Sequence, residues 1–167
     1  ETALSFTQKS KMDFLKTICN AYRKSPHFEE IMPLITEAVN YEEADLTEFI
    51  RFSIERVIAF LHIDTEILLS SQIDKDNTLK AEKRIIEICK ALHADTYINP
   101  CGGRALYSHS DFEREGIALF FLETKRENII YSQNQDFFVE NLSIIDVLMH
   151  NDIQTIKKYL NEYELRK

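Results

Sequence analysis

The sequence predicts an α/β fold: a helical N-terminal region, then a small, mostly parallel three- to four-stranded sheet flanked by helices. Two patterns predict this. Apolar residues recur at helical spacing up to about residue 62, and short apolar runs then alternate with helical segments. The order strand, helix, strand is typical of parallel pairing through right-handed crossovers. With 167 residues and 44% hydrophobic composition, we expect one domain over 1–167, divided into a helical part (about 10–62) and an α/β part (about 63–167).

Three helices are expected in the first part. The first carries apolar residues over 15–22 and ends before Pro26, because the residue preceding a proline disfavours helical backbone. The second covers about 28–39. The third has an almost unbroken apolar stripe over 46–61 and starts after Asp45, a residue type that caps helices.

In the second part, three apolar runs predict strands at 65–69, 96–98 and 117–122. A helix capped at Asn77-Thr78 is expected between the first two strands, and a short helical turn ending at Gly116 precedes the third. Two further helices are expected at the end, over 143–149 and from 152 to about 163.

The composition excludes several classes of function. A net charge of −8 repels phosphate backbones, so no nucleic-acid partner is expected, and no apolar run reaches the roughly 20 residues that insert into a membrane. The three cysteines, Cys19, Cys89 and Cys101, form no CxxC pair, which favours a reducing, cytoplasmic location without disulfides. The five histidines have no HxH or HExxH spacing, so no metal site is predicted.

Ligands of open parallel sheets bind beyond the carboxyl ends of the strands. This rule selects Ser70 and Ser71, the turn from Asn99 to Arg104, and residues 123–126. The serines either bind a phosphate or hydroxyl group or only end a strand. The turn holds Gly102 and Gly103, which either contact a ligand or only make a tight turn, and its Cys101 is either an inert thiol or a nucleophile.

Charged residues add two further candidates. Asp146 lies within an apolar helical segment, so it either makes a structural hydrogen bond or is the catalytic carboxylate. Six basic residues either form a solvated surface or a pocket for a phosphorylated ligand: Lys80, Lys83, Arg84, Arg104, Lys125 and Arg126.

Several of these segments, taken together, resemble the bacterial WbqC-like family. The most specific are the Gly102-Gly103-Arg104-Ala105-Leu106-Tyr107 loop and the Leu142-Ser143-Ile144-Ile145-Asp146-Val147-Leu148 helix; the similarity spans nearly the whole chain. The two motifs add Tyr107 and Ser143 to the expected ligand-binding residues.

The resemblance implies a role in bacterial surface-polysaccharide (O-antigen) biosynthesis. The expected activity is transfer, for example of an acyl or aminoacyl group, to an activated sugar or amino sugar, with a nucleotide sugar or amino acid as the small-molecule partner. The alternative is a non-catalytic ligand-binding or scaffold protein of a polysaccharide-synthesis complex. Family members usually carry an upstream segment, and we expect this chain to be a fragment that begins after it. Neither a cofactor nor an oligomeric state is indicated.

Overall fold

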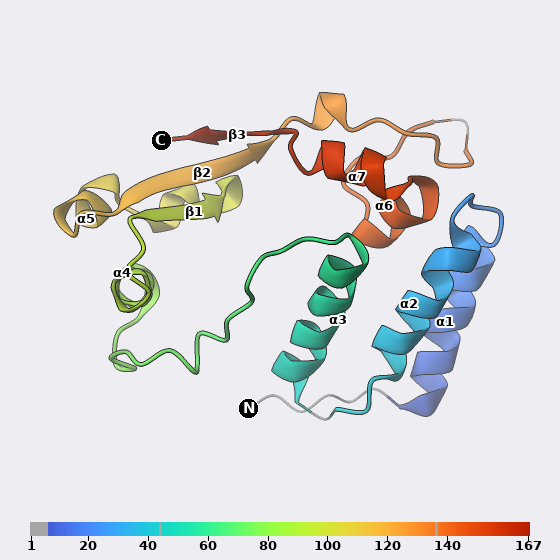
Figure 1. Cartoon of the computed structure of the whole chain (residues 1–167), viewed down its shortest axis with the longest axis horizontal. Helices are drawn as coiled ribbons and strands as arrows, with labels where there is room; N and C mark the ends of the chain where they lie inside the picture. Colours follow the sequence, from blue (N-terminus) through green and yellow to red (C-terminus); the bar gives the residue numbers. More distant parts are fainter. Residues whose placement is uncertain (1–6, 44, 136) are drawn as a thin grey trace. The chain divides into compact units, whose positions relative to one another are not determined.

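The computed structural model describes residues 7–43, 45–135 and 137–167 and divides into two compact units. Unit 1 consists of residues 1–67 and 129–161, and unit 2 of residues 68–128 and 162–167. Residues 129–161, which follow the second strand in the chain, belong to the same unit as the N-terminal helices. The elements of both units are labelled in Figure 1.

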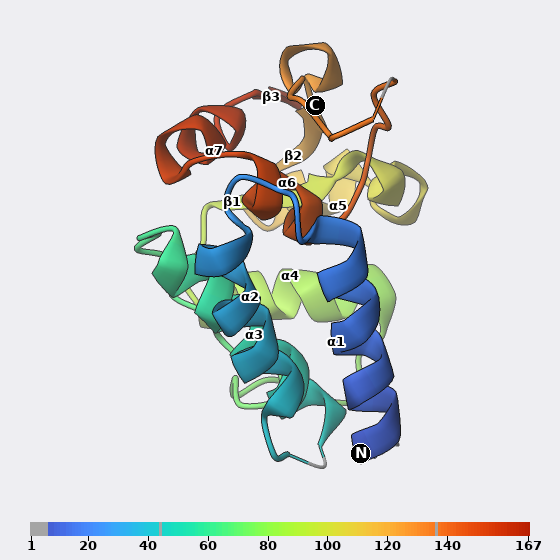
Figure 2. The ribbon, with the colours of Figure 1, turned by 90° about the vertical axis from the view of Figure 1, so that its right-hand side faces the viewer.

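Unit 1 is helical. Its elements are α1 (Gln8–Tyr22), α2 (Phe28–Asn40), α3 (Leu46–Phe60), α6 (Ile144–His150) and α7 (Ile153–Tyr159). The three expected N-terminal helices are thus confirmed, and α2 packs against both α1 and α3 (Figure 2). Asp45 caps α3 by accepting from the backbone N–H groups of Thr47 and Glu48, as its residue type predicts.

The core of unit 1 joins the N-terminal helices to the later ones. Ile31, Ile35 and Val39 lie one helical turn apart on the buried side of α2 and pack in one cluster with Leu148 and Met149 of α6. Met149 is 0% exposed. Burying a side chain of this size contributes roughly 1.5–3 kcal/mol, so α6 is anchored firmly on this face.

Unit 2 contains the sheet. Its elements are α4 (Ala81–Ala91), β1 (Thr96–Pro100), the 3₁₀ helix η1 (Cys101–Leu106), α5 (His109–Arg114), β2 (Ala118–Thr124), the 3₁₀ helix η2 (Arg126–Asn128) and β3 (Tyr163–Arg166). The strand order is β1-β2-β3: β1 and β2 are parallel, with Asn99 opposite Phe121, and β3 is antiparallel to β2. The α/β class is confirmed, and the sheet is mixed.

Three local predictions in unit 2 and near its boundaries were wrong. Residues 65–69 form no strand, and Ile67 and Leu68 are 37% and 49% exposed, because this short apolar run has no partner strand. Asn77-Thr78 does not cap α4: Thr78 bonds to Asp76 in a local turn, and the helix starts at Ala81. The last helix ends at Tyr159, and β3, which was not expected, follows it.

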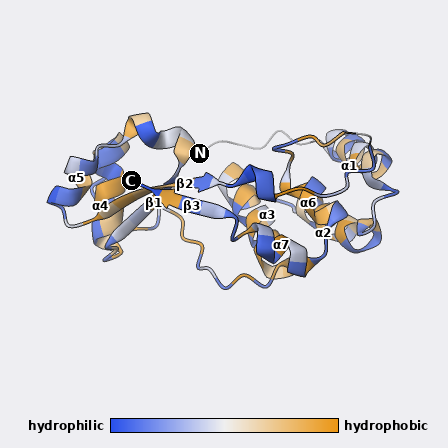
Figure 3. Cartoon of the chain, turned by 90° about the horizontal axis from the view of Figure 1, so that it is seen from above, coloured by the Kyte–Doolittle hydropathy of each residue, from blue (hydrophilic) through white to orange (hydrophobic). Residues whose placement is uncertain are grey.

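The core of unit 2 lies on the sheet, where Phe112 is 0% exposed and stacks on Tyr97 with 5.4 Å between ring centroids. It also contains Cys89, Leu119 and Phe121. Hydrophobic and hydrophilic residues follow one another closely along the helices of both units, as amphipathic elements require (Figure 3). No helix within the described residues has the length and hydropathy needed to cross a bilayer.

Candidate functional site

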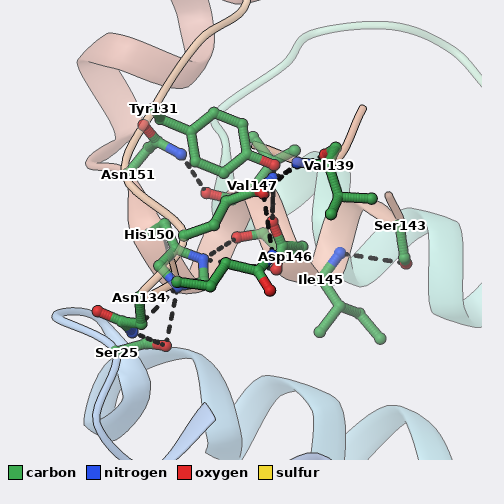
Figure 4. Close-up of polar contacts among 12 residues, drawn as sticks. Ser25, Tyr131, Asn134, Val139, Ser143, Ile145, Asp146, Val147, His150 and Asn151 are labelled. Carbon is green, nitrogen blue, oxygen red and sulfur yellow. Dashed lines mark hydrogen bonds and ion pairs between the residues drawn. The ribbon is translucent and has the colours of Figure 1, made fainter. Parts of the chain in front are cut away.

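A buried polar cluster surrounds Asp146 and His150 in unit 1 (Figure 4). The two residues lie four positions apart on α6, so their side chains share one helix face. Their side chains are 5% and 3% exposed. An acid and an imidazole this deeply buried need hydrogen-bond partners, and the surrounding residues supply them.

The Asp146 carboxylate is held by uncharged donors. The Tyr131 hydroxyl donates to Oδ2 over 2.7 Å, the Gln133 side-chain amide donates to the same oxygen over 3.3 Å, and Tyr22 adds a third hydrogen bond. Among the described residues, no lysine or arginine forms an ion pair with it. The carboxylate is therefore stabilised by hydrogen bonds and the nearby imidazole rather than by a fixed positive charge.

Both phenols that bond to Asp146 are poor acids. Burial, followed by the hydrogen bond to Asp146, raises the pKa of Tyr22 and that of Tyr131 to about 12. Both hydroxyls thus remain protonated donors at neutral pH.

The Gln133 side chain is itself fixed by the backbone. Its Oε1 accepts from the Val139 N–H over 2.7 Å, and its Nε2 donates to the Val139 carbonyl over 2.9 Å. This paired contact orients the amide, so that its nitrogen faces Asp146.

The contacts of His150 fix the proton on its ring. Nδ1 lies 2.9 Å from the Asp146 carbonyl oxygen and 3.6 Å from Asp146 Oδ1, and both of these atoms only accept. Nδ1 therefore carries the hydrogen in the neutral ring. The Nε2 lone pair then faces the Ser25 hydroxyl and the Asn134 amide nitrogen, each 3.2 Å away.

Ser25 lies in the turn between α1 and α2 and is 6% exposed. Its N–H donates to the Tyr22 carbonyl, and its hydroxyl also accepts from Asn134 Nδ2 over 3.2 Å. A hydroxyl beside the unprotonated nitrogen of an imidazole is the arrangement that activates a serine as a nucleophile; here the backbone carbonyl of Asp146 holds the other nitrogen, with the carboxylate 3.6 Å away. Residues 125 positions apart in the chain thus form a potential nucleophile and base pair.

A second group of predicted site residues comes together in unit 2, after the carboxyl end of β1. The Tyr97 hydroxyl donates to Asn99 Oδ1 over 3.2 Å, and Gly103 lies against Asn99 and Tyr107. A Cβ on Gly103 would overlap Asn99 Nδ2, whereas one on Gly102 would meet nothing within 4 Å. A side chain at position 103 would therefore displace the Asn99 side-chain amide, whereas one at position 102 would displace nothing.

Basic side chains accompany this turn. The guanidinium carbon of Arg104 lies 5.6 Å from the centre of the Phe121 ring, and Arg104 forms no ion pair among the described residues. Lys125 and Arg126 follow β2, which is parallel to β1 and ends at the same edge of the sheet. This edge can accept an anionic group.

The remaining candidates lie elsewhere. Ser70 and Ser71 do not line a groove that their neighbours Leu69 and Gln72 form with the C-terminal end of α4, which leads to the amino end of β1. Lys80 precedes α4 at its other end, and Ser143 caps α6 in unit 1. Neither unit by itself brings the glycine turn together with Asp146.

No metal-binding group of histidine, cysteine or acidic residues occurs within the ranges that the structure describes. The three cysteines are free, with Cys101 exposed and Cys89 buried. The potential nucleophile is therefore Ser25 rather than the Cys101 thiol, which has no imidazole among its recorded contacts.

Sequence reasoning singled out Asp146 but missed His150 and the two residues that contact its Nε2, Ser25 and Asn134. The spacing of Asp146 and His150 within one helix was a usable signal, whereas nothing local connects either residue to Ser25.

Comparison with known proteins gives one match. The model of the WbqC-like protein family matches residues 1–158. Neither a curated protein nor a solved structure matches the chain.

Proposed function

The chain belongs to the WbqC-like protein family, and we propose that it is a transferase that places an acyl or aminoacyl group on an activated sugar or amino sugar during synthesis of bacterial surface polysaccharide in the cytoplasm. The pathway is the one that the family resemblance implies. One observation supports the reaction type: the Ser25 hydroxyl lies 3.2 Å from the unprotonated Nε2 of His150.

In the proposed reaction, Ser25 Oγ attacks the carbonyl carbon of an activated acyl donor such as a thioester. His150 Nε2 takes the hydroxyl proton and passes it to the departing thiolate, which leaves an ester on Ser25. The amino group of the sugar then attacks this ester, giving its proton to His150, and the proton returns to Ser25 Oγ as the ester bond breaks. A general base of this type contributes roughly 10²–10⁴-fold to the rate.

Asp146 is a positioning residue in this scheme. It is 4% exposed, and its carboxylate oxygens already accept hydrogen bonds from side chains of this chain. Its negative charge beside Nδ1 keeps the imidazole in the tautomer that accepts the serine proton and stabilises the imidazolium that forms.

We assign the glycine turn of unit 2 to the binding of an anionic ligand. Arg104 offers a guanidinium without an ion-pair partner in the described ranges, and guanidinium groups bind phosphate through paired hydrogen bonds. The diphosphate of a nucleotide sugar is the anion that fits this proposal.

Intact-mass spectrometry of the protein after incubation with acyl-coenzyme A donors tests the covalent step. The expected result is a mass gain of one acyl group, lost in Ser25→Ala and His150→Gln and kept in the exposed control variants Ser110→Ala and His109→Gln. Thermal melting of each variant verifies that it folds.

Adding UDP-linked amino sugars then tests transfer, read as a mass gain of the sugar. Full acylation of Ser25→Ala would contradict the covalent step, and full transfer by His150→Gln would contradict the whole site. If the wild-type chain binds nucleotide sugars in a thermal-shift assay but never gains an acyl group, it is a non-catalytic binding protein.

A further inference from the structure

An apolar groove of about 430 Å³ lies on unit 1, away from the polar contacts of Asp146 and His150. Side chains of α2, α3 and α6 line it, among them Leu34, Val57 and Ile145. The groove is open, because the isoleucines Ile54 and Ile144 in its wall are 44% and 40% exposed. Such a cavity has the size and the apolar character of a small-molecule site.

One charged side chain interrupts the apolar wall. Arg56 lines the groove, its Nη1 donates to Glu37 over 3.3 Å, and its guanidinium carbon lies 5.3 Å from the centre of the Phe52 ring. Its Nε is buried and has no hydrogen-bond partner among the residues that the structure describes. The Arg56 side chain as a whole is 39% exposed, so this donor can pair with an acceptor oxygen that enters the groove.

We propose that this groove binds an acyl chain of medium length, with a carboxylate or carbonyl oxygen of the chain accepting a hydrogen bond from Arg56 Nε. The inference goes beyond the proposed function: the groove does not include Ser25 or His150, so its ligand is distinct from the group that is transferred. An engineered cavity of about 150 Å³ holds benzene, so a groove of nearly three times that volume suits an alkyl chain longer than a simple ring.

The charge distribution favours an acyl ligand over a second copy of the protein. In a two-fold contact between two such grooves, each Arg56 is already paired with Glu37 and carries only donors, so it would bring no acceptor for the Nε of the other. A purely apolar partner surface would leave Arg56 Nε unpaired. An amphiphile packs its alkyl chain against the apolar walls, and its oxygen-bearing end accepts the hydrogen bond from Arg56 Nε.

Isothermal titration with decanoate below its micellar concentration tests the proposal, with decylamine as the ligand of equal chain and opposite charge. We expect decanoate to bind with one site per chain and decylamine to bind about tenfold or more weakly, because it cannot accept from Arg56. Equal binding of the two ligands would overturn the role of Arg56, and no binding of decanoate would overturn the site.

Two variants on α3 form a matched pair. Ile54→Glu places a charge in the groove wall, whereas Ile50→Glu changes a residue of 46% exposure, one turn away, that does not line it. We expect the first to abolish decanoate binding and the second to retain it; loss in both variants would contradict the groove as the site.

Arg56→Leu keeps an apolar side chain and removes the donor, so we expect it to bring decanoate and decylamine to similar affinities. A preference for decanoate that survives this change would refute the assignment of the donor. Analytical ultracentrifugation tests the alternative that a second copy of the protein occupies the groove. If the wild-type chain is a dimer that Ile54→Glu dissociates, and decanoate does not bind, the occupant is a second copy and the acyl ligand is refuted.

The binding and transfer assays separate the two proposals. Decanoate binding without any acyl transfer would support the groove as a ligand site and refute the proposed reaction. Acyl transfer without decanoate binding would support the reaction and refute the groove as a ligand site.

Discussion

The bond between Tyr131 and Asp146 gives the sharpest stability test of the polar cluster. Tyr131→Phe removes one hydroxyl that donates over 2.7 Å to a carboxylate of 4% exposure and leaves the ring in place. Hydrogen bonds to charged groups contribute about 1.5–3 kcal/mol, so we expect the free energy of unfolding to fall by about 2 kcal/mol.

Replacing Asp146, the hydrogen-bond partner of Tyr131, should lower the free energy of unfolding further. Asp146→Asn removes the charge and, with its oxygen kept at the Oδ2 position for Tyr131 and Gln133, places an amide donor beside the protonated Nδ1 of His150. We expect a loss of about 3 kcal/mol, because two donors then face each other in a buried site. In the double variant the loss should be smaller than the sum by about 1.5 kcal/mol, since the shared bond is counted once.

Urea denaturation followed by far-ultraviolet circular dichroism measures these values, with hydrogen exchange at α6 to assign the transition to unit 1. In thermal melts, Tyr131→Phe should lower the Tm by about 4–8 °C for a chain of this size. Tyr163→Phe is the control, because this tyrosine is 40% exposed and should change stability by less than about 0.5 kcal/mol. Strict additivity of the two changes, or a neutral Tyr131→Phe, would refute the reasoning.

Three further outcomes are expected. Gly103→Ala should cost about 1 kcal/mol in urea denaturation, because its Cβ would displace the Asn99 side-chain amide and break the hydrogen bond from Tyr97, whereas Gly102→Ala, which meets open space, should be nearly neutral; equal effects would contradict the packing argument. In mass-spectrometric labelling at neutral pH, exposed Cys101 should react with iodoacetamide well before Cys89, which is buried and whose pKa burial raises; the reverse order would contradict the core assignment. The two phenols bonded to Asp146 have pKa values raised from 10.0 to about 12, so the unfolded chain releases these protons first, and stability should fall as pH rises from about 10 to 12. Ultraviolet titration of tyrosinate checks this, and release of all phenolic protons near pH 10 would contradict it.

The helices of unit 1 could be predicted because their signals are local. The stripe over 46–61 and the cap at Asp45 lie within one stretch of chain, and both match the structure. The strands were predicted less well than the helices. Residues 65–69 have the apolar composition of a strand. A strand also needs a second strand to pair with, and a short run of sequence does not show whether such a partner exists.

The third strand shows the opposite error. Tyr163–Arg166 alternates apolar and charged residues over only four positions, shortly after α7. A stretch of this length is too short for its pattern to distinguish a strand from a continuation of the helix. Its partner, residues 121–124, lies about forty positions earlier. The site behaved in the same way: Asp146 was identified from its apolar surroundings, whereas the contact of His150 with Ser25 depends on tertiary packing of α6 against the turn between α1 and α2.

The chain passes between its two units three times, near residues 67, 128 and 161. Neither unit can therefore be expressed alone as one uninterrupted piece. A fragment of residues 68–128 would lack β3 and leave the backbone of Phe121–Thr124 without its ladder partner. An unpaired strand edge of this kind can pair with the strand of another molecule and cause aggregation. To study unit 2 by itself, residues 162–167 must therefore remain attached through a circular permutation or a linker.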